Sequence, residues 1–117
     1  MCHVLIIEDD WLIADYIEHL ARDAGATSIM IVDSEIDAVA AASGHCPGII
    51  LSDVNLRTGT GPLAVQTIQA EWGHIPVIFI TATPQDCVPC LFPAVILSKP
   101  LNAPALTETF KRLAPID

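Results

Sequence analysis

A small set of side chains suited to metal and phosphoryl chemistry follows short apolar runs of the sequence. Glu8 and Asp9 come directly after HVLII, and Asp53 follows GIIL and one serine. Thr81 follows PVIFI, and Lys99 follows AVIL and one serine. Mg²⁺ prefers carboxylate oxygens, and a phosphoryl group held on a side chain requires a nucleophilic carboxylate, a metal, a hydroxyl donor and a cation. The sequence therefore predicts a Mg²⁺-dependent phosphoryl site, provided that these side chains meet.

The apolar runs alternate with helical patterns, which is typical of an α/β fold. We expect strands at residues 3–7, 28–32, 48–51, 76–80 and 94–97. We expect helices at 12–24, after a capping box at Ser34, at 62–72, and from a cap at Asn102 to about Leu113. Short strands that are apolar on both faces call for a parallel sheet covered by helices on both sides. Ligands bind beyond the carboxyl ends of such strands, where the side chains above are expected to lie.

Charge repulsion makes a bound cation necessary if the carboxylates converge. At about 4 Å and an effective dielectric constant near 20, each carboxylate pair costs about 4 kcal/mol. Each residue also has an ordinary structural interpretation. Glu8 and Asp9 could cap the next helix, and Asp53 could lie in a solvated turn. The Thr81 hydroxyl could form a hydrogen bond with the backbone of a loop, and Lys99 could be an ordinary surface cation. The interpretation as a site depends on their arrival at different strand ends of one sheet.

The whole chain resembles the receiver domain of bacterial two-component response regulators. The motifs that carry the resemblance are VLIIEDD, ILSDVNL, PVIFITAT and LSKP, in the order of the family. The resemblance implies a flavodoxin-like (CheY-like), doubly wound, five-stranded parallel sheet with helices on both faces, formed by a single receiver domain over residues 1–117. It also implies that Asp53 accepts a phosphoryl group from a phosphohistidine of a sensor histidine kinase or a histidine phosphotransfer protein.

The resemblance also implies the ligands of the metal ion. Asp9 and Asp53 would bind Mg²⁺ directly, Glu8 would bind it through water, and Asn55 would contribute its backbone carbonyl.

The remaining roles concern the phosphoryl group itself. By the same resemblance, Thr81 would donate a hydrogen bond to it, and Lys99 would pair with another of its oxygens, with the Lys99–Pro100 peptide in cis. Negative charge enters an acidic pocket during transfer, and Mg²⁺ and Lys99 offset it, so no transfer is expected without metal. The chain would be no enzyme beyond its own phosphorylation and dephosphorylation.

The stretch between Thr81 and Lys99 departs from the receiver pattern. It is shorter than usual, and its TPQDCVPCLFP segment contains three prolines, which break helices. The fourth helix of the family is therefore expected to be short or missing, as in receivers of the alphaproteobacterial general stress response, which this segment resembles. Ile96 stands where many receivers carry an aromatic switch residue. Ordering of residues 83–93 by phosphorylated Asp53 is the alternative output.

Composition argues against nucleic acid and membranes as primary partners. Apolar residues make up 52% of the chain, and 14 acidic residues stand against five basic ones, for a net charge of −9. Binding to phosphates or anionic lipid needs Lys and Arg. No apolar run approaches the roughly 20 residues that span a bilayer, and no cationic leader is apparent. We expect a cytoplasmic, single-domain regulator, a monomer or weak dimer, that acts on a downstream protein.

Other functions fit parts of the sequence. Cys87 and Cys90 form a CxxC that is typical of thiol-redox proteins, but the prolines around it preclude the usual long helix, and reduced cysteines in a tight loop are expected instead. GTGPLA, at residues 59–64, matches a dinucleotide-binding pattern, but its distance from the preceding strand favours a mobile loop beside Asp53.

Two further alternatives concern the acidic site. An aspartyl phosphatase would carry its nucleophile after the first strand and a second acid two positions later, whereas Asn55 follows Asp53 here. A degenerate receiver that acts as a phosphorylation-independent binding module is the stronger alternative, since the altered segment after Thr81 permits it.

Overall fold

The computed structural model describes residues 2–87 and 94–116. Its elements, in chain order, are β1 (His3–Ile7), α1 (Trp11–Asp23), β2 (Ser28–Val32), α2 (Glu35–Gly44), β3 (Ile49–Ser52), α3 (Gly61–Trp72), β4 (Val77–Thr81), the 3₁₀ turn η1 (Pro84–Asp86), β5 (Ala94–Ser98) and α4 (Ala103–Leu113). The predicted alternation of strands and helices is confirmed, and the bounds of the strands differ from the predicted ones by a single residue or none.

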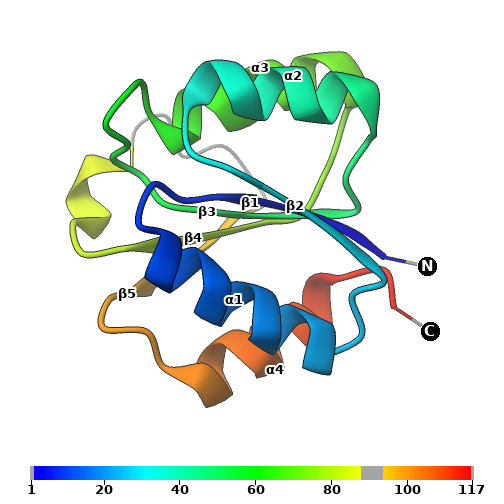
Figure 1. Cartoon of the computed structure of the whole chain (residues 1–117), viewed down its shortest axis with the longest axis vertical. Helices are drawn as coiled ribbons and strands as arrows, with labels where there is room; N and C mark the ends of the chain where they lie inside the picture. The colour runs from blue at the N-terminus through cyan, green and yellow to red at the C-terminus, as the bar shows by residue number, and fades with distance from the viewer. Residues whose placement is uncertain (1, 88–93, 117) are drawn as a thin grey trace.

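The five strands form one parallel sheet in the order β2-β1-β3-β4-β5. Helices α2 and α3 cover one face of this sheet, and α1 and α4 cover the other (Figure 1). This arrangement confirms the doubly wound α/β fold. Because all strands run in the same direction, their carboxyl ends lie along one edge. None of the helices in the described part of the chain is both long and apolar enough to cross a bilayer.

Successive residues of β1 pack into two separate cores, because side chains alternate between the faces of a strand. Val4 and Ile6 lie in the core under α1 and α4, which contains Phe110. Leu5 and Ile7 lie in the core under α2 and α3, which contains Ile68. All four β1 residues are essentially inaccessible to solvent. The central strands are therefore fixed from both sides, and their carboxyl ends form a rigid base for polar side chains.

Each α-helix in the described residues begins after a polar residue that caps it. The side chains of Asp10, Ser34, Thr60 and Asn102 each accept a hydrogen bond from a backbone N–H of the first turn. Such caps satisfy donors that have no partner within the helix. Asp10 is thus the member of the Glu-Asp-Asp run that caps α1. Glu8 and Asp9 are therefore not needed for that role.

The segment after β4 contains only the 3₁₀ turn η1 within the described residues, which agrees with the expected short fourth helix. Pro84 opens this turn, and a proline fits the first helical position because its missing N–H would have no partner there. Cys87 is disulfide-bonded and so differs from the reduced thiol expected, whereas Cys2 and Cys46 are free. Cys90 and most of the predicted switch segment 83–93 lie outside the described residues.

The fold leaves no room for a side chain at Gly61. A Cβ at this position would overlap the backbone carbonyl oxygen of Asp53 and the hydroxyl of Ser52. We expect Gly61→Ala to lower the free energy of unfolding by about 2 to 3 kcal/mol, because the backbone between β3 and α3 must move apart. Urea denaturation measures this change.

Gly44→Ala is the matched control. A Cβ at Gly44, the last residue of α2, would meet no atom within 4 Å. Alanine also favours a helical backbone over glycine, so this variant should be neutral or gain up to about 1 kcal/mol. Equal losses in the two variants would show that the contact at Gly61 carries no special cost.

Candidate functional site

Three carboxylates meet at the carboxyl edge of the sheet, as the sequence predicted. Glu8 and Asp9 follow β1, and Asp53 follows β3, the adjacent strand. One oxygen of each lies within 4.8 Å of the others. Glu8 is buried, with 3% of its surface exposed, and the other two are partly buried. The acidic cluster, defined as these three residues, therefore brings like charges together where little water screens them.

Lys99 bridges two members of the acidic cluster. Its Nζ lies 3.2 Å from Glu8 Oε1 and 3.1 Å from Asp53 Oδ2. Because β4 separates β5 from β3 in the sheet, the lysine reaches this position by extending across the end of β4. Its backbone N–H donates to the carbonyl of Thr81, and the Lys99–Pro100 peptide is cis, as the resemblance to receiver domains implied.

Burial and charge act in opposite directions on this pair. Burial raises the pKa of the Glu8 carboxyl and Asp53 adds to this effect, while the Asp10 N–H and Lys99 offset part of it. Burial disfavours the Lys99 ammonium, but the Glu8 and Asp53 carboxylates outweigh that effect and raise the pKa of Lys99. The lysine therefore stays charged at neutral pH. With the carboxylates ionised, three negative charges and one positive charge leave two negative charges, which a divalent cation would neutralise.

A backbone N–H and the Lys99 side chain fix the orientation of the Asp53 carboxylate. Its Oδ1 accepts a hydrogen bond of 2.7 Å from the N–H of Val54, and its Oδ2 contacts Lys99. The Ser52 hydroxyl donates to the Asp53 carbonyl, and the Asp53 N–H donates to the Ile7 carbonyl at the end of β1. The carboxylate is thus held between two donors. Sequence reasoning assigned no role to Ser52, since a serine at a strand end carries no distinctive pattern.

The loop between β3 and α3 is hydrogen-bonded to Asp9, which follows β1, and to Glu35 in α2. Asp9 Oδ2 accepts a hydrogen bond of 2.7 Å from the Arg57 N–H. Glu35, in the first turn of α2, accepts one of 3.0 Å from the Thr60 N–H and donates its own N–H to the Thr58 carbonyl. These hydrogen bonds tie residues 57–60 to neighbouring elements, and the mobility expected for GTGPLA stays a prediction. The Glu35 carboxylate accepts the hydrogen bond of the Thr60 N–H from 25 positions away, so the local sequence could not predict this contact.

Thr81 and Asn55 point toward the segment after β4. Thr81 is buried, and its hydroxyl accepts a hydrogen bond of 3.0 Å from the Thr83 N–H. The Asn55 amide donates to the Thr83 hydroxyl at 2.8 Å and to Asp86 Oδ2 at 3.0 Å. Within residues 2–87 and 94–116, neither side chain bonds to the acidic cluster. Phosphoryl binding by Thr81 and metal binding by the Asn55 carbonyl stay predictions. Asp86 is a partner that the sequence did not indicate.

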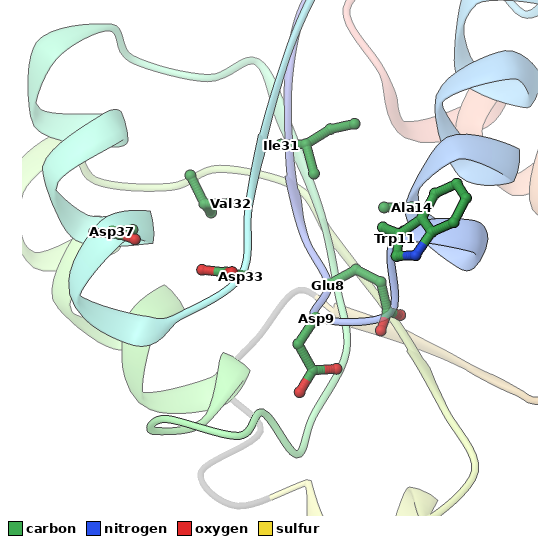
Figure 2. A pocket seen from close by; sticks show the side chains of 8 residues that line it. All are labelled: Glu8, Asp9, Trp11, Ala14, Ile31, Val32, Asp33 and Asp37. Atoms are coloured by element: carbon green, nitrogen blue, oxygen red, sulfur yellow. The ribbon is translucent and has the colours of Figure 1, made fainter.

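The acidic cluster fits Mg²⁺ by the type and number of its donors. Carboxylate oxygens are the ligands this ion prefers, and it usually retains several waters. A pocket of about 340 Å³ opens beside Glu8 and Asp9 and leaves room for water (Figure 2). Lys99 neutralises only part of the cluster, so binding of a further cation is favoured.

Known proteins share this sequence and arrangement. The family model for the response regulator receiver domain matches residues 4–111. The chain is 39% identical over 83 residues to the phyllosphere-induced regulator PhyR of Methylorubrum extorquens, a match that covers 70% of this chain and 31% of that protein. The chain thus spans about a third of the length of this curated relative.

Two solved structures are also similar. One is the anti-anti-sigma factor PhyR from Bartonella quintana, with a TM-score of 0.82, 31% identity, and coverage of 96% of this chain and 48% of that chain. The other is the receiver domain of a sensor histidine kinase from Pseudomonas aeruginosa, solved with a magnesium ion coordinated in its active site cleft. Its TM-score is 0.83, its identity is 27%, and the match covers 96% of each chain.

We expect Glu8→Gln to raise the free energy of unfolding at pH 7 in the absence of divalent cations. Burial raises the pKa of Glu8 above its unfolded value, so the ionised carboxylate costs stability at any pH above the folded pKa. The gain from the neutral amide should be complete there and should vanish as the pH falls below the unfolded pKa of about 4.5. Urea denaturation between pH 3 and pH 8 measures it.

Glu108→Gln serves as the control for this pH series, because Glu108 is an exposed acid on α4. Its unfolding free energy should follow that of the parent chain across the range. A Glu8→Gln variant less stable than the parent at pH 7 would show that the ion pair with Lys99 outweighs the burial of the carboxylate.

Proposed function

The chain belongs to the response regulator receiver domain family, and on that premise we propose that it is a phosphoacceptor protein of a two-component system. Asp53 takes a phosphoryl group from a phosphohistidine of a sensor histidine kinase or phosphotransfer protein, in a Mg²⁺-dependent step. The observation that carries this proposal is the meeting of the acidic cluster with Lys99 at one edge of the sheet.

Transfer needs a carboxylate oxygen free to attack and a second one held in place. In the proposed step, an Asp53 oxygen forms a bond to phosphorus as the bond from phosphorus to the donor histidine nitrogen breaks. The Val54 N–H orients Oδ1, and Lys99 lies beside Oδ2, from which its ammonium can move to a phosphoryl oxygen. Because both donors come from residues just after strands of the sheet, the Asp53 carboxylate requires little reorganisation.

Charge explains the need for metal in this proposal. A phosphoryl group adds up to about two negative charges to a site that is already acidic. In the part of the chain that the structure describes, Lys99 is the one basic side chain that pairs with the acidic cluster. Mg²⁺ held by Asp9 and Asp53, with Glu8 through water and the Asn55 carbonyl, would neutralise this charge and orient the phosphoryl oxygens.

The output is proposed to begin at Thr81. When its hydroxyl turns to a phosphoryl oxygen, the Thr83 N–H loses its acceptor and the contacts of Asn55 with the η1 turn change. This route does not need the aromatic switch residue of other receivers, whose position Ile96 occupies with 40% of its surface exposed.

A protein is the proposed target of the signal. The relative from Bartonella quintana is named an anti-anti-sigma factor, and this chain matches 48% of its length. Regulation through protein contacts also suits a chain with a net charge of −9, which repels nucleic acid.

We expect the purified chain to gain one phosphoryl group from acetyl phosphate when Mg²⁺ is present. Asp53→Asn should gain none, because the amide is not a nucleophile, and chelation of Mg²⁺ should abolish the gain in the parent chain. Asp23→Asn, which changes an exposed aspartate at the end of α1, should be modified like the parent. Intact mass spectrometry measures the product. Failure of the folded parent with acetyl phosphate and with a kinase-derived donor would leave a phosphorylation-independent binding module.

We expect Asp9→Asn to weaken Mg²⁺ binding about tenfold or more, since it removes a charged ligand. Trp11 lines the pocket beside Glu8 and Asp9, so its fluorescence should report the titration. A Trp72→Phe background removes the other of the two tryptophans. Asp33→Asn is the control, because Asp33 lines the same pocket but lies outside the acidic cluster. Equal weakening by both variants would contradict the proposed ligands.

A further inference from the structure

The pocket beside the acidic cluster has a second part that the phosphoryl site does not use. It lies between the first turns of α1 and α2 and the carboxyl end of β2 (Figure 2). An apolar wall on the α1 side of β2 is formed by Trp11, Ala14 and Ile31, whereas Val32 points to the α2 side because side chains alternate along a strand. We call this part, together with Asp33 and Asp37, the β2 pocket.

The apolar wall of the β2 pocket is unusually accessible. Trp11 exposes 75% of its surface, and Ile31 exposes 39%. β2 is an edge strand, so one side of Ile31 has no neighbouring strand in the described residues. Tryptophan buries a large area and dominates many protein interfaces when it is covered. An exposed tryptophan over an open pocket therefore favours a contact with another molecule.

The opposite side of the β2 pocket carries only negative charge. Asp33 and Asp37 are exposed, and neither carboxylate has a hydrogen bond or ion pair within the described part of the chain. Glu8 and Asp9 add two more acids on the side of the phosphoryl site, and no basic side chain lines the pocket. Such a surface repels nucleic acid and anionic membranes and attracts a cationic group.

We propose that the β2 pocket binds an arginine side chain from a basic segment of a partner protein. An apolar residue of the same segment can cover Trp11 and Ile31 on the α1 side of β2, and the aliphatic stem of the arginine suits Val32 on the α2 side. Its fork of N–H donors can pair with the free carboxylates of Asp33 and Asp37. Lysine fits less well, because its compact ammonium does not offer a planar fork of donors to the two carboxylates. The proposal depends on the pocket and not on phosphorylation of Asp53.

The test titrates the isotope-labelled full chain with a blocked peptide, Gly-Leu-Arg-Leu-Arg-Leu-Gly, and follows the backbone amide signals by NMR. A matched peptide carries citrulline, a neutral isostere, at both arginine positions. Divalent cations and phosphodonors are omitted, so the result is independent of the proposed function. We expect shifts concentrated at the first turn of α1, the end of β2 and the first turn of α2, and binding of the citrulline peptide at least tenfold weaker.

Variants separate a specific pocket from general charge attraction. Asp33→Asn combined with Asp37→Asn should weaken binding about tenfold, and Trp11→Ala should weaken it severalfold. The Trp11 variant should still fold, because this side chain is largely exposed. Asp23→Asn combined with Glu108→Gln removes the same charge from exposed sites elsewhere and should change the affinity less than twofold. Equal weakening by the two double variants, or shifts centred outside the pocket, would overturn the proposal.

Discussion

Mutual repulsion among the three carboxylates of the acidic cluster is the constraint that the rest of the structure must meet. Glu8 and Asp53 are drawn together by one lysine, whose Nζ lies between their oxygens at 3.2 and 3.1 Å. This contact offsets only part of the repulsion, and burial still raises the pKa of Glu8. The fold therefore holds these groups against an unfavourable electrostatic energy, which a bound divalent cation would reduce.

The scaffold supplies the rigidity that this arrangement needs. Each central strand is packed between two cores, so its carboxyl end cannot move away from its neighbour. The loop after β3 is tied at Asp9 and at Glu35, and Gly61 lets the chain pass close to the Asp53 carbonyl. Asp10 stabilises α1 as its cap, so an acid next to the cluster serves the fold and not the site. Strand packing, the cap of α1 and the close turn at Gly61 thus all help to fix the positions of the charged groups.

The sequence predicted those parts of the structure that follow from local patterns. The apolar runs identified the strands, and the polar residues just after them identified Glu8, Asp9, Asp53 and Lys99 as neighbours. Contacts between side chains far apart in sequence could not be predicted in this way. Asn55 and Asp86 are 31 positions apart, and Glu35 bonds to a loop residue 25 positions away. Such contacts depend on the final distances between loops, and no periodicity encodes them.

Glu8 and Asp9 belong to the acidic cluster and also line the pocket that continues to Asp33 and Asp37. A cation held by the cluster reduces the negative potential at the β2 pocket, and a bound guanidinium does the same in return. Thermodynamic linkage makes these effects equal, so each ligand weakens the other by the same factor. A partner at this pocket would therefore sense the charge state of the acidic cluster directly. That coupling needs no aromatic switch on β5, where this chain carries Ile96, because it acts through charge over a short distance.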